Sequence, residues 1–414
     1  MAGRRQRRLM AGTALAVLIL PLGVIAQEAG GLRLTFGVGF RAETSSNLAL
    51  ENPDEGRTNQ FATRLSFRLE DETRVGSLSL AASGFLRALD GPDGTETGFE
   101  TPDLRFGLHQ EGARSALDVT AFLREADLDT LRGTLVDPDT GEVSTLSGQG
   151  TQRQTGGNVA YTFGAGEPWG LTLSAGLTDT TYRDAPDEVD NRRANAGATL
   201  RFALNPATEA TLALRASTYK EDGAARRDTL RAEAGLARSL PLGTVSATLF
   251  AEDTEDGTRS GLSFGHSIDL ASGGRLSYSL GATRSASGDT NLTGALDWTK
   301  ALPRGSLSLG LRRAVTSGEG DAETLATSLN LGVTQDLSPR TGLTIGLIAA
   351  EAEDTATGDS TRTATLNATL THALTEDWAL DAGYSYRWRD EDGTGRATSD
   401  RLFLELRREF EWRP

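Results

Sequence analysis

The side chains best suited to catalysis are scarce in this chain. It has no cysteine and only three histidines, His109, His266 and His372. The lack of cysteine excludes a thiol nucleophile, a cysteine-ligated zinc site and a disulfide framework. No histidine has a recognisable serine or aspartate constellation beside it in the sequence, as a hydrolase would need. We therefore predict that the protein is not an enzyme and that it holds no cofactor and no resident metal.

Arginine and the acidic residues offer ion binding instead. Arginines recur at alternate positions, as Arg33 and Arg41 do on either side of Leu34 to Phe40, whereas acidic residues gather in clusters such as Glu252 to Asp256. A row of arginines can bind anions, and acidic clusters can bind cations. The formal net charge of -15 disfavours a nucleic-acid partner. What these charges do depends on the elements that carry them.

Those elements have a period of two almost throughout. Apolar Leu32, Leu34, Phe36, Val38 and Phe40 alternate with polar residues or glycine, and the same pattern returns at Leu65 to Leu69 and at Leu307 to Leu311. Such alternation over roughly ten residues predicts β-strands with one apolar and one polar face. We expect about 20 strands, with 18 or 16 as alternatives. They would begin near residues 31, 59, 76, 102, 114, 152, 170, 191, 208, 227, 243, 258, 274, 290, 305, 323, 341, 361, 378 and 399.

The connections between these strands alternate between two kinds. Some are tight, such as Asn205-Pro206-Ala207 and Pro303-Arg304-Gly305, and others are longer and acidic, such as Glu351 to Asp359. Short turns at one end and long loops at the other are typical of outer-membrane barrels. With 37% hydrophobic residues and a mean hydropathy of -0.33, the chain lacks both the core of a large sandwich and the spans of a helical membrane protein. We predict an all-β, transmembrane, antiparallel up-and-down β-barrel, with a soluble β-helix or propeller as the alternative.

The N-terminus has the features of an export signal. Arg4, Arg5, Arg7 and Arg8 precede an apolar run from Leu9 to Ile25, which ends before the small residue Ala26. A basic start, an apolar middle and a small residue at the end predict a signal peptide at residues 1–26, cleaved after Ala26. A single anchoring helix is the alternative. The mature chain, residues 27–414, would then be one barrel domain in the outer membrane.

Several segments resemble known outer-membrane proteins. The opening strand Leu34 to Phe40, the polar stretch Thr44 to Asn47 and the paired strands that follow are similar to the poorly characterised β-barrel porins of proteobacteria. The resemblance implies a porin-like architecture without naming a solute. The last strand, with Phe410 and Trp412, resembles the C-terminal signal that the outer-membrane assembly machinery recognises. Trp169, Trp298, Trp378 and Trp412 lie beside tight turns or the C-terminus, as interfacial aromatics do.

The longest connection spans residues 125–150 and resembles, in position and length, the inward-folding third loop of general porins. Its Asp137, Asp139 and Glu142 could form a constriction. They could also chelate Ca²⁺, although a plain turn built by Asp, Pro and Gly is the simpler interpretation. Acidic loops of this kind could bridge to lipopolysaccharide phosphates through divalent cations.

Strand parity sorts the charged side chains between the two faces of each strand. A charge on the lipid face would cost about 2–4 kcal/mol per arginine at the midplane, so we assign the charges to the interior. The predicted inner acids are Asp118, Glu233, Asp269, Asp297, Asp336, Asp381 and Glu405, and His109 shares their face. The predicted basic pore-lining residues are Arg33, Arg41, Arg64, Arg68, Arg87, Arg105, Arg124, Arg201, Arg215, Arg231, Arg275, Arg312, Arg387, Arg389, Arg401 and Arg407.

On this assignment the wall is net basic and the mouth is acidic, which favours a mild anion preference. We predict a passive, porin-like channel for small polar or anionic solutes, or for a secreted polysaccharide. The alternative is a structural or surface-interaction barrel whose lumen is blocked by arginine–carboxylate networks. An outer-membrane enzyme that uses His109 is a weaker third hypothesis. The expected partners are outer-membrane lipid, lipopolysaccharide and the assembly machinery, and the sequence carries no signal for the number of subunits.

Overall fold

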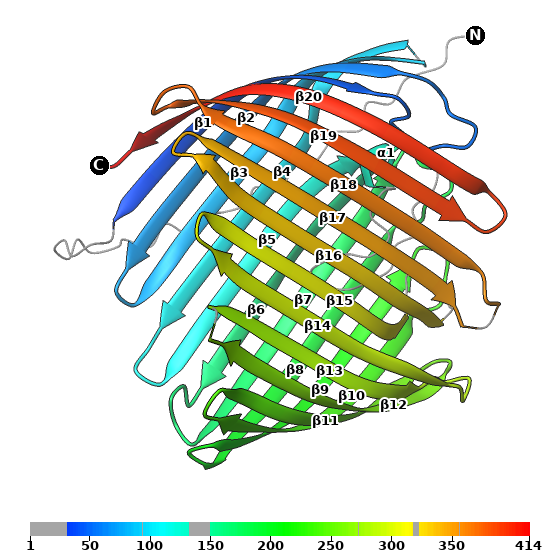
Figure 1. The fold of residues 1–414 in the computed structure, drawn as a ribbon. Helices are drawn as coiled ribbons and strands as arrows, with labels where there is room; N and C mark the ends of the chain where they lie inside the picture. The colour runs from blue at the N-terminus through cyan, green and yellow to red at the C-terminus, as the bar shows by residue number, and fades with distance from the viewer. Residues whose placement is uncertain (1–30, 93, 132–149, 272, 318–322, 356) are drawn as a thin grey trace, which may run out of the picture.

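A closed barrel of twenty antiparallel strands accounts for nearly all of the described chain (Figure 1). The computed structural model describes residues 31–92, 94–131, 150–271, 273–317, 323–355 and 357–414. Each strand pairs with the next one along the chain, and β20 (Gly395–Trp412) pairs with β1 (Leu32–Ser45) to close the cylinder. The expected all-β, up-and-down architecture and strand number are therefore confirmed.

The strands contain 11 to 18 residues. One short helix, α1 (Leu128–Leu131), follows β5. No helix in the described ranges is long and apolar enough to cross a membrane. The remaining strands are β2 (Thr58–Thr73), β3 (Gly76–Gly91), β4 (Gly94–Glu111), β5 (Ser115–Asp127), β6 (Thr151–Phe163), β7 (Trp169–Arg183), β8 (Asn191–Asn205), β9 (Thr208–Glu221), β10 (Arg227–Leu240), β11 (Gly243–Thr254), β12 (Gly257–Leu270), β13 (Gly274–Arg284), β14 (Thr290–Leu302), β15 (Gly305–Ser317), β16 (Glu323–Ser338), β17 (Thr341–Asp354), β18 (Ser360–Ala373) and β19 (Trp378–Glu391).

Two strands begin earlier than the sequence pattern indicates. We expected β4 near residue 102 and β20 near residue 399, but they start at Gly94 and Gly395. In both cases the backbone hydrogen bonds between strands extend toward the N-terminus of the strand, beyond the residues that alternate between apolar and polar. The β3–β4 hairpin, for example, pairs Gly91 with Gly94 and absorbs a register shift between Ser83 and Phe85. Strand pairing needs only backbone donors and acceptors, so it can extend beyond the residues whose side chains alternate.

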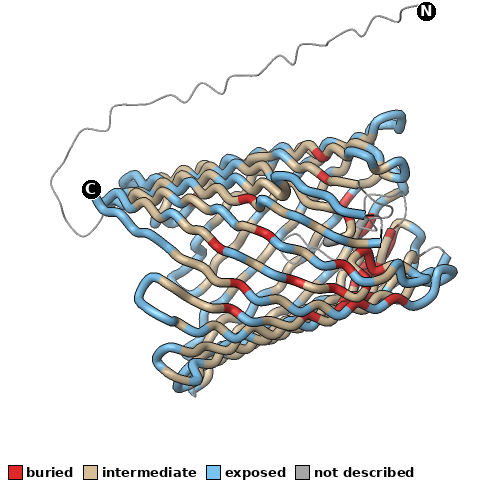
Figure 2. The backbone as a smooth tube through the Cα atoms, turned by 90° about the horizontal axis from the view of Figure 1, so that it is seen from above, coloured by how far each residue is buried: buried red, intermediate tan, exposed pale blue. Residues whose placement is uncertain are grey.

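The two ends of the barrel differ in the length of their connections. At one end, short turns such as residues 74–75 and 241–242 join the strands. At the other end, longer segments such as residues 46–57, 184–190 and 355–359 join them, although tight hairpins also occur there. Figure 2 shows that the most deeply buried residues gather toward one end of the barrel.

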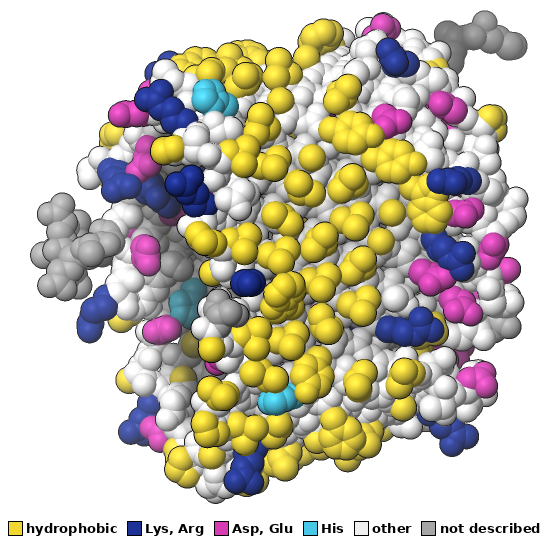
Figure 3. All heavy atoms as spheres, viewed as in Figure 1, with side chains coloured by type: hydrophobic (Ala, Val, Ile, Leu, Met, Phe, Trp, Pro, Cys, Tyr) yellow, Lys and Arg dark blue, Asp and Glu magenta, His cyan; other side chains and the backbone are white. Residues whose placement is uncertain are grey.

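Apolar side chains cover the outer face of the barrel. Phe61, Phe264, Leu280 and Leu292 are each at least 60% exposed. Figure 3 shows apolar side chains across the middle of the visible face, with most charged side chains toward its two ends. Trp298 and Trp378 share this outer register and lie next to short turns, with Arg408 stacked 5.4 Å from the Trp378 ring centre.

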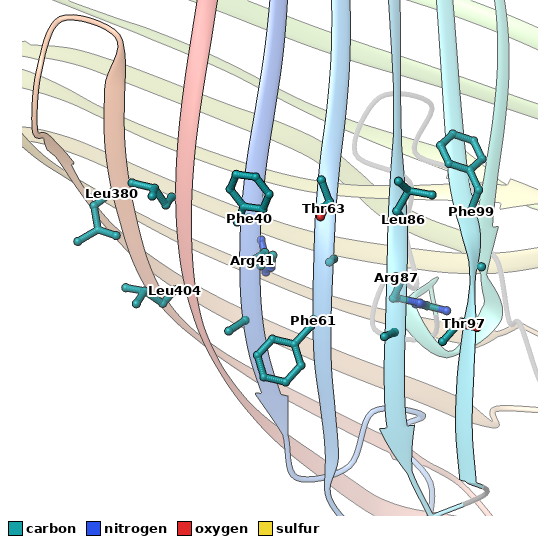
Figure 4. A pocket seen from close by; sticks show the side chains of 15 residues that line it. Phe40, Arg41, Phe61, Thr63, Leu86, Arg87, Thr97, Phe99, Leu380 and Leu404 are labelled. Atoms are coloured by element: carbon teal, nitrogen blue, oxygen red, sulfur yellow. The ribbon is translucent and has the colours of Figure 1, made fainter.

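A groove on this outer face shows the alternation at close range (Figure 4). Phe40, Phe61, Leu86 and Phe99 project from four neighbouring strands, β1 to β4, and border a hollow of about 750 Å³. The next residue along β1, Arg41, belongs to the opposite face, where it pairs with acidic side chains. The middle of the barrel therefore has an apolar outside and a charged inside, whereas outward-facing charges such as Lys300, Arg362 and Arg408 lie near the strand ends.

Candidate functional site

The inner wall of the barrel carries the candidate functional residues. In β1, outward Phe40 is 51% exposed and pairs with Leu406, whereas Arg41 pairs with Glu405. The antiparallel register repeats this alternation from strand to strand. It places all sixteen arginines that were assigned to the interior on the inner face of their strands.

One side of the inner wall is a charge ladder across β19, β20 and β1. Arg41 donates to Glu43 at 2.6 Å and to Glu405 at 3.3 Å, and Arg401 lies 3.1 Å from Glu43. The Glu43 side chain is only 5% exposed. A buried carboxylate between two guanidiniums is held tightly, because losing either partner would leave a charge away from water.

Arg387 of β19 ties two inserted segments to this same side. Its guanidinium donates to the backbone carbonyls of Asp129 (3.1 Å), Asn47 and Leu48. Asp129 belongs to α1, in the connection after β5, and residues 47 and 48 belong to the connection after β1. Leu128 of α1 is fully buried. The beginning of the longest connection therefore enters the barrel and reaches β19.

The opposite side of the wall, across β10 to β12, carries a second charge cluster. Glu252 accepts hydrogen bonds from Arg231 (3.1 Å) and Arg259, and Arg259 also lies 3.5 Å from Glu323 of β16. The Arg259 and Glu252 side chains are each 8% exposed. The two clusters lie on strands about half a circumference apart, as Figure 1 shows.

Most of the inner arginines are neutralised by carboxylates, and a few are not. Arg64 lies over the Phe85 ring and Arg124 donates to Gln154. Arg215 and Arg312 form neither an ion pair nor a side-chain hydrogen bond to any described residue, and Arg387 binds carbonyls. The inner arginines with an ion pair are Arg33, Arg41, Arg68, Arg87, Arg105, Arg201, Arg227, Arg231, Arg259, Arg275, Arg389, Arg401 and Arg407.

The sequence-based sets of inner acids and inner arginines were both incomplete, and the inner wall carries the two signs of charge in closer balance than the sequence indicates. The strand register adds Arg193, Arg227 and Arg259 to the inner arginines. The seven acids assigned to the interior do share its register. That register also adds carboxylates that were assigned to loops or left unassigned, because the strands extend beyond their apolar stretches. The added inner acids include Glu43, Glu70, Asp103, Glu209, Glu221, Glu252 and Glu391.

His109 has partners that the sequence analysis missed. Its Nδ1 lies 2.6 Å from Asp118 of the neighbouring strand, and its Nε2 lies 3.3 Å from Glu111. Asp118 is nine residues away in the sequence but directly opposite in the β4–β5 register. Carboxylates at both ring nitrogens favour a doubly protonated ring that donates twice, whereas a general base needs a free nitrogen. His266 and His372 lie on the outer face, as expected from their parity.

The remaining sequence-based site falls outside the described residues. Asp137, Asp139 and Glu142 lie there, as do residues 1–26. Among the residues that are described, no group of three or more His, Asp or Glu side chains is arranged to hold a metal ion.

Comparison with known proteins shows a shared fold. No protein-family model and no curated protein matches the chain. Among solved structures, a variant of the ferric enterobactin receptor PfeA from Pseudomonas aeruginosa aligns with a TM-score of 0.51 at 11% identity, covering 93% of this chain and 81% of that one. The siderophore receptor PirA from the same organism aligns at 0.49 and 13% identity, covering 93% and 81% of the two chains. OccK3 (OpdO), also from that organism, aligns at 0.41 and 12% identity, covering 92% and 96%.

Proposed function

We propose that this protein is an outer-membrane β-barrel that works as a passive, porin-like channel for small polar and anionic solutes. The observation that carries the proposal is the two-sided wall, with large apolar side chains exposed outside and charged side chains inside a closed sheet. In hydrocarbon, every backbone hydrogen bond must be satisfied within the protein, and a closed barrel meets that requirement. An exposed apolar surface of this extent is unfavourable in water and favourable in lipid.

The dimensions of the barrel support an aqueous interior. Twenty strands spaced ~4.8 Å apart and tilted by ~40° enclose a cylinder of roughly 40 Å backbone diameter. Side chains extend only about 7 Å from the wall, so they leave a central space that water or an inserted loop must occupy. The charged inner faces of β1, β10 and β19 suit water better than a dry core.

The pairing of charges limits the selectivity that we propose. Because most inner arginines are paired with carboxylates, the wall produces only a weak positive electrostatic potential in the lumen. The arginines without ion-pair partners, such as Arg215 and Arg312, supply what anion preference remains. We therefore expect weak anion selectivity. A secreted polysaccharide is the alternative solute, since paired charges and hydroxyl-bearing side chains also suit a neutral, hydrated polymer.

A planar-bilayer recording tests the channel proposal. Refolded protein should give stepwise ionic currents, and a salt gradient should give a reversal potential that favours Cl⁻ over K⁺ by a small factor. The control is the same preparation denatured before addition to the bilayer. A correctly folded barrel, verified by heat-modifiable gel migration, that conducts no ions would contradict the proposal.

A second candidate function is a structural or surface-interaction barrel with a closed lumen. The observation in its favour is the attachment of α1 and of residues 47 and 48 to Arg387, which holds inserted chain against the inner wall. In that case the recording would be silent in the native protein, and releasing the inserted segments would open it.

Processing and partners follow from the proposed location. We propose that cleavage after Ala26 releases a mature chain that begins at Gln27, which intact-mass measurement of the protein from outer membranes would test. We propose that Phe410 and Trp412, at the end of the closing strand, engage the assembly machinery. Replacing both with alanine should lower the amount of folded barrel in cells while refolding in vitro stays efficient. Lipopolysaccharide is the proposed partner of the acidic loops.

A further inference from the structure

A cavity of about 490 Å³ lies against the inner wall formed by β8 to β11. Arg193, Tyr219 and Arg227 are cross-strand neighbours along one side of it. Both guanidiniums lie over the tyrosine ring, at 5.3 Å and 4.6 Å from its centre. Arg227 is also paired with Glu221 at 3.2 Å. This side of the cavity therefore carries two guanidiniums that the tyrosine ring and Glu221 hold in place.

The other side lies four residues along the same strands. There Arg215 is placed between Gly197 of β8 and Arg231 of β10. Arg231 forms ion pairs with Glu233 and Glu252, each at 3.1 Å. Arg215 forms no ion pair or side-chain hydrogen bond within the described ranges, although it faces another arginine directly. Gly197 has no side chain to cover it. The Arg215 guanidinium therefore has N–H donors without acceptors in the described part of the chain and lies close to a second positive charge. An incoming anion would accept hydrogen bonds from those donors and would reduce the repulsion between the two guanidiniums.

Between these two sides is a row of uncharged polar residues. Asn195, Ser217 and Thr229 are register partners on β8, β9 and β10, and all three line the cavity. Together they offer an amide and two hydroxyl groups, each able to donate and to accept. These groups can form hydrogen bonds with the hydroxyl groups of a polyol or sugar. If an inorganic anion were bound instead, they would be hydrogen-bonded only to water.

We infer that this cavity is a binding subsite for a small hydroxylated solute that carries an oxyanion. Arg215 would pair with the oxyanion, and Asn195, Ser217 and Thr229 would bind the hydroxyl groups. A carboxylate and a phosphate share the chemistry that a guanidinium recognises, so either source fits. The inference rests on the proposed channel, through which the solute reaches the subsite. Four acidic residues also line the cavity, namely Asp228, Glu252, Glu255 and Asp256, and they limit its attraction for an anion. A limited attraction suits transit, because the solute must be able to leave the site.

Calorimetric titration of the refolded full-length protein in detergent micelles tests the subsite without needing a current. The probes are gluconate, glucose 6-phosphate, glucose and inorganic phosphate. The variant is Arg215→Gln, and the matched control is Arg312→Gln, which removes the same charge from another inner arginine without an ion-pair partner and outside the cavity. We expect gluconate or glucose 6-phosphate to bind the native protein at least about tenfold more tightly than glucose or inorganic phosphate. Arg215→Gln should weaken that binding by about tenfold, and Arg312→Gln by less than about twofold.

The outcomes separate the subsite from the channel. The tighter of the two sugar anions identifies the oxyanion as carboxylate or phosphate. Glucose or inorganic phosphate binding as tightly as both sugar anions, no detectable binding by any probe, or equal losses in the two variants would overturn the subsite while leaving the channel proposal intact. Binding that depends on Arg215 in a protein that conducts no ions would support the subsite and contradict the channel.

Discussion

At the scale of single residues, burial distinguishes structural charges from charges that can act on a solute. Glu43 and Arg387 are almost fully enclosed by their partners, whereas Arg215 and Arg312 have none among the described residues. Removing an enclosed charge leaves its partners unsatisfied and costs stability. Removing an accessible arginine changes the field in the lumen and costs little stability.

Arg387→Gln should release the inserted chain. The shorter side chain cannot reach the carbonyls of Asp129, Asn47 and Leu48 together, so we expect a loss of about 2–3 kcal/mol in the free energy of unfolding. We also expect larger or noisier single-channel currents. Urea titration in vesicles, followed by tryptophan fluorescence, measures the first effect and bilayer recording the second. Arg389→Gln, which changes the next inner arginine along β19, one that is ion-paired with Glu391, serves as the control. Equal effects in the two variants would contradict a tethering role for Arg387.

Glu43→Gln tests the charge ladder. The neutral amide keeps the shape but loses the charge that holds Arg41 and Arg401, so we expect a cost of about 1–3 kcal/mol in unfolding free energy. Glu391→Gln, at a more exposed pair, should cost less than about 1 kcal/mol. The same urea titration compares them. A ladder that contributes nothing would give indistinguishable curves for the two variants.

At the scale of elements, the sequence predicts the strands well because each strand carries its own two-sided pattern. It predicts the site less well. The starts of β4 and β20 and the inner position of Glu43 depend on ladders that run past the apolar residues. The Asp118 partner of His109 depends on cross-strand register. The contact between Arg387 and Asp129 joins positions 258 residues apart, so no local pattern indicates it.

The two faces of one strand should respond unequally to the same substitution. Leu214, at the middle of β9, is 51% exposed on the outer face, and neighbouring Ala213 faces Glu233 on the inner face. Leu214→Arg should cost about 2–4 kcal/mol in vesicles, and Ala213→Arg should cost little, because it finds water and a carboxylate. Unfolding titrations of both variants in the same lipid measure the difference. Similar losses for the two would argue against the assignment of the faces.

At the scale of the whole molecule, closure makes the proposed function possible. Pairing of β20 with β1 leaves no free edge in the described sheet, so the strands can lie in hydrocarbon while the interior stays polar. The inner charges are largely balanced across the wall. That balance favours a channel with weak selectivity, in which a few unpaired arginines distinguish one solute from another.

The central claim, a lipid-facing outside and a water-filled inside, is tested most directly by accessibility along one strand. Because the chain has no cysteine, single cysteines can be introduced on β13 at Leu276, Ser277, Ser279 and Leu280. In proteoliposomes, a charged water-soluble maleimide should label Ser277→Cys and Ser279→Cys rapidly and leave Leu276→Cys and Leu280→Cys unlabelled until detergent and denaturant are added. Equal labelling at all four positions, or rapid labelling only at the leucine positions, would contradict the account.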